Sequence, residues 1–413
     1  MSTQHYQQLV FKIKVLTVIF CLTCLSSQAK QPVIATYYVA SGNPIAVSNL
    51  PAKKLTHILY AFGALCGNNS TANDEIQKAI AIACKGKPPY SAVFFHEKEV
   101  MSELSAFKKL KLQHPHLRIL PSFGGWTLSQ PFHGMAKSGV DRKHFVQSAI
   151  ELIEKNDVFD GIDIDWEYPG GGGKSQITLT KSQAINERNA FKLLMKEFRV
   201  KLDKLAINTG RKYQLTAAVS GSKARTQAID WKGTIPAMDY VFAMTYDFSV
   251  GNGQAGHHTN LFSSNISSLS TEGMINNLID AGVPAKKIAV GVAFYGRGWT
   301  NVDWQDKLFS KNNKAISTGS YSYKHLKKNP PSGYIYGYDP QVQAAYFFNA
   351  KVKGFISFDD RRSTLAKAEW AREKGLAGVF SWQILQDNGD LLDAMYQGMH
   401  PFNIKNTAFD NKL

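Results

Sequence analysis

The sequence has few features that would attach it to a membrane or to nucleic acid. Beyond its first 29 residues it contains no run of 18 apolar residues, so no transmembrane helix is expected there. The formal net charge is +16, but the basic residues are scattered and form no block of five or six like charges. Nucleic-acid binding is therefore not expected, and the basic balance indicates at most an affinity for anionic surfaces.

Cysteine is scarce, with four residues in a chain of 413. Cys21 and Cys24 lie in an apolar run within residues 1–29, which has lysines before it and small residues at its end. Such a segment is typical of a secretory signal peptide. The mature protein is therefore expected outside the cell or in a periplasm, with no membrane attachment after cleavage. Cys66 and Cys84 then remain as a candidate disulfide, and two buried free thiols are the alternative.

Short apolar segments alternate with segments of helical spacing along the rest of the chain, which predicts parallel βα units. Eight such units close into a (β/α)8 TIM barrel, an α/β fold. The predicted strands are residues 33–39, 55–62, 117–126, 159–168, 213–220, 240–247, 287–296 and 375–383.

One segment of the chain exceeds what such a barrel requires. Residues 299–362, between the seventh strand and the seventh helix, are rich in Tyr, Gly and Lys and are predicted to form a small α+β insertion. The barrel would then comprise residues 30–298 and 363–413. A disordered linker is the alternative, but so many aromatic residues argue against it.

The fourth predicted strand carries four acidic residues within eight positions. The stretch reads Phe159-Asp160-Gly161-Ile162-Asp163-Ile164-Asp165-Trp166-Glu167-Tyr168-Pro169. Because side chains alternate along a strand, the last three acids share one face and the apolar residues between them share the other. Three carboxyls in a column repel each other and lose water, and no cation is near them in sequence. The pattern favours acids that share protons, so that the last acid is a proton donor near neutral pH.

Two other interpretations of this stretch fit less well. A solvated acidic loop would not place apolar residues with a period of two. A Ca²⁺ or Mg²⁺ site would use the same oxygen ligands, but alternate residues of a strand do not resemble a calcium-binding loop.

The spacing Asp160-x-x-Asp163-x-Asp165-x-Glu167 resembles the signature of glycoside hydrolase family 18, the chitinases. Residues 122–125 are similar to the family's strand-three motif, and residues 244–247 to its strand-six motif. Residues 299–362 resemble the chitinase insertion domain. The resemblance covers residues 32–400 and implies hydrolysis of β-1,4-linked N-acetylglucosamine polymers, with no metal or organic cofactor.

The resemblance also implies a retaining, substrate-assisted mechanism. Glu167 would protonate the glycosidic oxygen while the substrate's acetamido oxygen attacks the anomeric carbon. Asp165 would accept a hydrogen bond from the acetamido N–H, and Asp163 would share a proton with Asp165. Tyr246 would donate to the acetamido carbonyl oxygen and completes the expected catalytic set.

A second set is implied to contact the substrate or support the residues that do. Trp382 would form an apolar floor under a distorted sugar, and Trp126 would stack on a neighbouring one. Asp247 would bind sugar hydroxyls, and Asp160 would support the motif structurally. The set comprises Asp160, Tyr37, Trp126, Met244, Asp247, Arg297 and Trp382.

The sequence departs from the family after the strand-six motif. Residues 248–253 contain no Trp or Tyr, although many members carry an aromatic there, so processive sliding on crystalline chitin is not expected. Little sequence lies outside the expected barrel and insertion, so no separate carbohydrate-binding module is expected. Soluble or amorphous chitin and chito-oligosaccharides are the favoured partners, bound by a monomer.

Three other functions are weighed against this one. Chitinase-like lectins keep the barrel but lose the acid, which is present here at Glu167. A related family 18 hydrolase would cut N-glycan cores or peptidoglycan strands, and the products would distinguish it. A basic surface adhesin would bind cells in a strongly salt-sensitive way.

Overall fold

The computed structural model describes residues 31–263, 269–304 and 313–400. The expected signal peptide, residues 1–29, lies outside the described residues. No helix in the described part of the chain is both long enough and apolar enough to cross a membrane.

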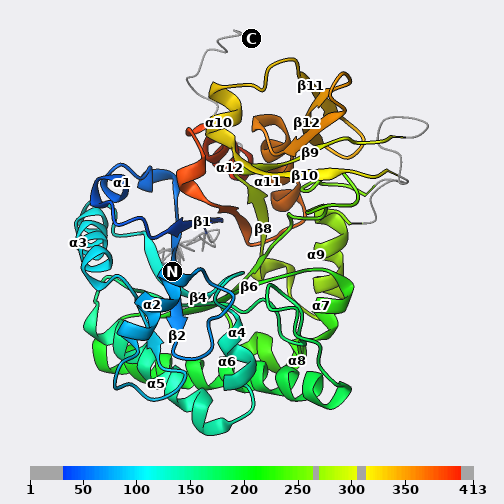
Figure 1. The fold of residues 1–413 in the computed structure, drawn as a ribbon. Coiled ribbons are helices and arrows are strands. Elements are labelled where there is room, and N and C mark those ends of the chain that lie inside the picture. The colour runs from blue at the N-terminus through cyan, green and yellow to red at the C-terminus, as the bar shows by residue number, and fades with distance from the viewer. Residues whose placement is uncertain (1–30, 264–268, 305–312, 401–413) are drawn as a thin grey trace, which may run out of the picture. The chain divides into compact units, whose positions relative to one another are not determined.

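Eight parallel strands form a closed barrel (Figure 1). The first strand pairs with both the second and the last, which closes the ring. The strands are β1 (Val33–Val39), β2 (His57–Leu65), β4 (Arg118–Gly124), β5 (Gly161–Asp165), β6 (Gln214–Val219), β7 (Tyr240–Ala243), β8 (Ile288–Ala293) and β14 (Gly378–Trp382). A short antiparallel strand, β3 (Ala92–Val93), pairs with β2. The predicted TIM barrel is confirmed.

Helices separate the strands as the alternating pattern predicts. They are α1 (Pro44–Ser48), α2 (Asp74–Ala83), α3 (Glu97–Gln113), α4 (Gln130–Met135), α5 (Gly139–Lys155), α6 (Lys181–Thr209), α7 (Lys223–Gln227), α8 (Trp231–Thr234), α9 (Thr271–Asp280), α10 (Tyr323–Lys328), α11 (Arg361–Glu373) and α12 (Asp390–Met399). The longest, α6, begins at a capping box in which Thr180 and Gln183 satisfy each other's backbone N–H groups. It ends at Gly210, whose φ of 66° lies in the left-handed region that glycine tolerates.

Strand alternation divides the barrel core into two hydrophobic clusters. Along β1, Ile34 and Tyr38 belong to the cluster that the helices share, whereas Ala35 and Tyr37 belong to the one that lines the strands' other face. On β5 the isoleucines belong to the first cluster. The carboxyls lie on the opposite face from the isoleucines, as the period-two pattern predicts, and this face is the barrel interior.

A second sheet is inserted between β8 and α11. Its strands are antiparallel neighbours in the order β10 (Ile316–Ser322), β9 (Tyr295–Thr300), β13 (Gly354–Phe358), β12 (Ala344–Asn349) and β11 (Ile335–Asp339). The predicted strand 287–296 is two strands, because Phe294 is the last residue bonded to the barrel and the next residue pairs with β10. The inserted sheet therefore begins ahead of the predicted boundary at residue 299.

Cys66 and Cys84 form a disulfide across 18 residues of sequence. It joins the residue after β2 to the C-cap of α2. The structure thus answers the question that the sequence left open between a disulfide and two free thiols.

Candidate active site

The end of β5 is tied to the end of β4 by backbone and hydroxyl contacts. Gly125 N donates to Asp165 O over 2.7 Å. Ser129 Oγ lies 2.9 Å from Gly125 O and 3.0 Å from Asp165 O, and it accepts from Glu167 N over 2.8 Å. These contacts fix the backbone from which the last two acids project. Sequence reasoning missed Ser129, which follows the strand-three motif at a position that no periodicity marks.

Asp163 is fully buried and held by three hydroxyl groups from three other strands of the barrel. Its carboxylate accepts from Tyr37 Oη of β1 at 2.9 Å, from Ser122 Oγ of β4 at 2.7 Å and from Thr216 Oγ1 of β6 at 2.5 Å. Burial raises the pKa of Asp163, and these hydrogen bonds oppose the rise. Among the described residues no hydrogen bond joins Asp163 to Asp165, so the expected shared proton stays a prediction.

Asp165 is buried, and one of its carboxyl oxygens lacks a hydrogen-bond donor. Its Oδ1 has no hydrogen-bond partner among the described residues. Burial, together with the negative charges of Glu167 and Asp163, raises the pKa of Asp165 well above its usual range. A buried acceptor without a donor costs free energy. The site therefore favours a ligand that brings an N–H or O–H group to this carboxyl.

Glu167 is buried at the C-terminal end of the barrel strand, where TIM barrels carry their chemistry. Burial raises its pKa to about 7. The Tyr168 hydroxyl and the Arg225 cation lower that pKa, while the Asp247 charge raises it. Arg225 lies 4.5 Å from the centre of the Tyr168 ring. A carboxyl with a pKa near 7 is suited to donating a proton and taking it back.

Asp247 follows β7 but receives its partners from the inserted sheet. Tyr295 Oη and Arg297 Nε each donate to its Oδ1 over 2.8 Å, and Arg297 Nη2 donates to its Oδ2 over 2.7 Å. Burial opposes ionisation, yet His258 and Arg297 hold the pKa of Asp247 well below its usual range. Its φ of 61° lies in the left-handed region, which aspartate adopts more readily than most residues with a side chain. These partners hold this carboxylate as an anion.

The aromatic residues predicted for the site come together beside the acids. Trp382 lies 5.2 Å from Tyr37 between ring centres, and it stacks on Phe62 at 5.6 Å. Met244, Tyr246 and Trp382 pack against the same hydrophobic cluster. Trp126 follows β4 with 48% of its surface exposed, which leaves an apolar face available to a ligand.

Asp160 is not brought together with the other predicted residues. It precedes β5, roughly 16 Å along the strand from Asp165 at about 3.3 Å per residue. Its carboxylate accepts from Ile119 N at 2.9 Å, from Lys111 at 2.6 Å and from Arg211 at 3.1 Å. Grouping Asp160 with substrate-binding residues was wrong in position, because strand direction places it at the opposite end of the barrel. The contacts fit the structural support that the motif also predicted.

A separate pair of side chains supports the loop after Glu167. Glu187 Oε2 accepts from Gly170 N over 2.8 Å, and His133 Nδ1 lies 2.7 Å from Glu187 Oε1. Both residues line a cavity of about 490 Å³ that none of the predicted site residues enters. Within the described ranges, no group of three or more His, Cys, Asp or Glu residues is arranged to hold a metal ion.

Comparison with known proteins places this geometry in context. Residues 33–387 match the family described as glycosyl hydrolases family 18. Chitinase A of Pseudoalteromonas piscicida is 35% identical over 430 residues, which cover 89% of this chain and 52% of that protein. A probable endochitinase of Orgyia pseudotsugata multicapsid polyhedrosis virus is 35% identical over 88% of this chain and 71% of its own length. The chain thus spans about half of the first relative and more than two thirds of the second.

A solved structure shows the same fold. The family 18 N-acetylglucosaminidase from Paenibacillus barengoltzii matches with a TM-score of 0.73 and 28% identity, over 89% of this chain and 99% of that one.

Proposed function

The chain belongs to the glycosyl hydrolases of family 18, and we propose that it is a chitinase that cleaves β-1,4-linked N-acetylglucosamine polymers and oligomers. One observation carries the proposal. A carboxyl with a pKa near 7, Glu167, lies two residues after a buried carboxyl, Asp165, which has an acceptor oxygen without a donor. An acid beside an acceptor fits a substrate that carries an amide next to the bond to be broken.

We propose a retaining, substrate-assisted mechanism. Glu167 gives its proton to the glycosidic oxygen, and the bond between that oxygen and the anomeric carbon breaks. The substrate's acetamido oxygen forms the new bond to the anomeric carbon and gives an oxazolinium-like intermediate. Asp165 accepts a hydrogen bond from the acetamido N–H and balances the positive charge of the intermediate. Tyr246 donates a hydrogen bond to the acetamido oxygen. Water then attacks the anomeric carbon, the bond from that carbon to the acetamido oxygen breaks, and the proton that water loses returns to Glu167.

The remaining residues of the site bind and orient the sugars. Trp382, supported by Phe62 and Tyr37, offers an aromatic face to the apolar face of a pyranose. The fixed carboxylate of Asp247 accepts hydrogen bonds from sugar hydroxyls. Trp126 offers a second aromatic face at the exposed end of the site.

Secretion belongs to the same proposal. Residues 1–29 have the composition of a signal peptide, and the disulfide suits an oxidising compartment. Recovery of a chain without residues 1–29 outside the cytoplasm would test it.

The decisive experiment is hydrolysis of chitotetraose, with products and anomers followed in time. We expect shorter oligosaccharides released initially as the β-anomer. Initial release of the α-anomer would contradict retention, and release of monosaccharide alone would indicate an N-acetylglucosaminidase. Failure of the folded protein to cleave chitotetraose would contradict the proposal and lead to tests on N-glycan cores and peptidoglycan.

The pH dependence of kcat/KM follows from the acid. Glu167 must be protonated before reaction, and its pKa is raised to about 7, so kcat/KM should fall about tenfold per pH unit above that value. The measurement is initial rates between pH 5 and 9. Arg225→Met removes a positive charge that favours the ionised form, so it should move this decline to higher pH. A rate that stays constant to pH 9 would exclude Glu167 as the acid.

A further inference from the structure

A buried ion pair lies close to the site, yet the proposed reaction does not use it. Lys367 on α11 and Asp359, just after β13, have side chains that are 0% and 1% exposed. Lys367 Nζ lies 2.9 Å from Asp359 Oδ1 and 2.7 Å from Oδ2. Because the loss of hydration can outweigh the attraction within a buried pair, stability alone explains it poorly.

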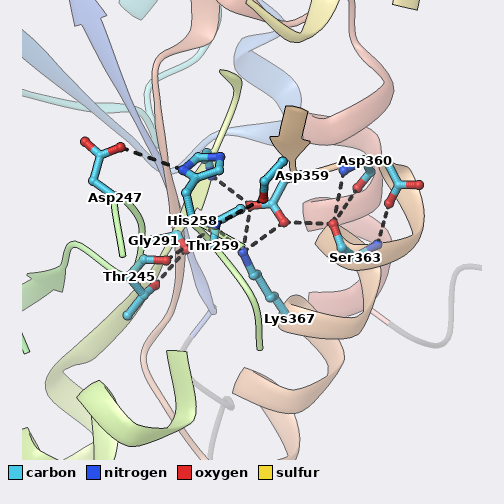
Figure 2. Close-up of polar contacts among 11 residues, drawn as sticks. Thr245, Asp247, His258, Thr259, Gly291, Asp359, Asp360, Ser363 and Lys367 are labelled. Atoms are coloured by element: carbon cyan, nitrogen blue, oxygen red, sulfur yellow. Dashed lines mark hydrogen bonds and ion pairs between the residues drawn. The ribbon is translucent and has the colours of Figure 1, made fainter. Parts of the chain in front are cut away.

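The pair is satisfied by partners from several elements, as Figure 2 shows. Ala293 N, at the end of β8, donates to Asp359 Oδ2 over 3.0 Å, and Ser363 Oγ donates to Oδ1 over 2.7 Å. Thr259 Oγ1 accepts a hydrogen bond from Lys367 Nζ at 2.5 Å and donates one to Asp359 Oδ2 over 2.9 Å. The pair thus fixes the end of a barrel strand and the segment that contains Thr259.

That segment is in direct contact with the backbone around Asp247. Thr259 Oγ1 lies 3.4 Å from Thr245 O, and Phe248 N donates to His258 O over 3.1 Å. His258 Nδ1 lies 3.7 Å from Asp247 Oδ1, and this contact is drawn in Figure 2. Residues on both sides of Asp247 therefore rest on the segment that the ion pair holds.

The other partners of Asp247 depend on the same pair through the chain. Tyr295 and Arg297 lie on β9, which begins two residues after Ala293. Asp359 bonds Ala293, which lies where the chain leaves the barrel for the inserted sheet. Asp359 itself lies where the chain returns from that sheet. One ion pair thus fixes both groups of residues that orient the Asp247 carboxylate.

We propose that Lys367 and Asp359 are positioning residues for sugar binding, which act through Thr259 and the ends of the inserted sheet to hold Asp247. Neither touches the substrate. The inference rests on the proposed function, because Asp247 is taken there as a sugar-binding carboxylate.

The test is binding of chitotetraose by calorimetry in a Glu167→Gln background, where turnover does not interfere. Lys367→Met keeps the length of the side chain but removes its charge, and we expect Kd to rise about tenfold. Lys111→Met is the matched control. Lys111 forms a mostly buried ion pair with Asp160 at the other end of the barrel, so its loss should lower the unfolding temperature but leave Kd unchanged.

Thr259→Val provides a second variant if Lys367→Met does not fold. Valine has nearly the same shape and leaves the ion pair in place, but it removes the hydroxyl that links the pair to Thr245, so Kd should rise about threefold. An unchanged Kd in folded Lys367→Met or in Thr259→Val would overturn the inference, as would an equal loss in Lys111→Met. If the Glu167→Gln parent itself bound no chitotetraose, the proposed function would fail instead.

Discussion

Glu167→Gln is expected to lower kcat on chitotetraose by about 10³-fold, while Kd for the same sugar changes by less than about threefold. Glutamine fills the same volume, so the site should keep its shape. Its amide has no proton to give at the glycosidic oxygen, and it cannot act as a base toward water in the second step. Loss of kcat with intact binding distinguishes an acid from a residue that only binds.

The stability of the same variant provides an internal check. The pKa of Glu167 rises from its ordinary 4.5 to about 7 on folding, so the folded state holds its proton more tightly than the unfolded state. Above pH 7 the ionised carboxyl therefore opposes folding and lowers the free energy of unfolding by roughly 3 kcal/mol. Glu167→Gln should remove this penalty and raise the unfolding temperature at pH 8 but not at pH 4. Wild-type turnover in the folded variant would remove Glu167 as the acid.

Asp165→Asn is expected to lower kcat by about 10²-fold on N-acetylated oligosaccharides, since one correctly placed charge contributes about this much to a transition state. The asparagine side chain is neutral, so it cannot balance the positive charge of an oxazolinium-like intermediate. Its amide group can also turn a donor toward the acetamido N–H, which is itself a donor. The measurement is the initial rate on chitotetraose, with binding measured in parallel.

Asp160→Asn is the matched control for this variant, because it makes the same change in the same motif. Asp160 lies among Lys111, Arg118 and Arg211 at the other end of β5. Its replacement should lower the unfolding temperature with little change in kcat. Full activity in Asp165→Asn would count against substrate assistance, and equal losses of kcat in both variants would show that only motif integrity is being measured.

Local patterns in the sequence predict the parts of the fold that depend on local physics. Helical segments were predicted between the strands, and the structure has α3, for example, at Glu97–Gln113 between β3 and β4. Period-two alternation predicted that Asp163 lies on the face of β5 opposite the isoleucines, which in the structure is the face toward the barrel interior. The eight strands followed from the alternation of strand-like and helical segments, so barrel closure could be inferred without any contact being known.

Features that depend on contacts distant in sequence were not predictable in the same way. The strand expected at 287–296 breaks at Phe294 because its continuation pairs with β10 and β13, which come later in the chain. Thr216 and Ser129 reach the acids only once β6 and β4 pair with β5. The position of Asp160 required the direction of the strand as well as its spacing, since a motif shows which residues are near in sequence but not which end of a barrel each one occupies.

The partners of Asp247 bear on how this enzyme could be redesigned. The aspartate belongs to a barrel loop, whereas Tyr295 and Arg297 belong to the inserted sheet. A chimera that exchanges residues 295–358 for the corresponding sheet of another barrel would leave Asp247 without its cationic partner unless the donor supplies an equivalent arginine at the same register. Insertion and barrel loop therefore have to be transplanted together. A library that varies one while keeping the other constant would leave Asp247 misaligned in most of its members.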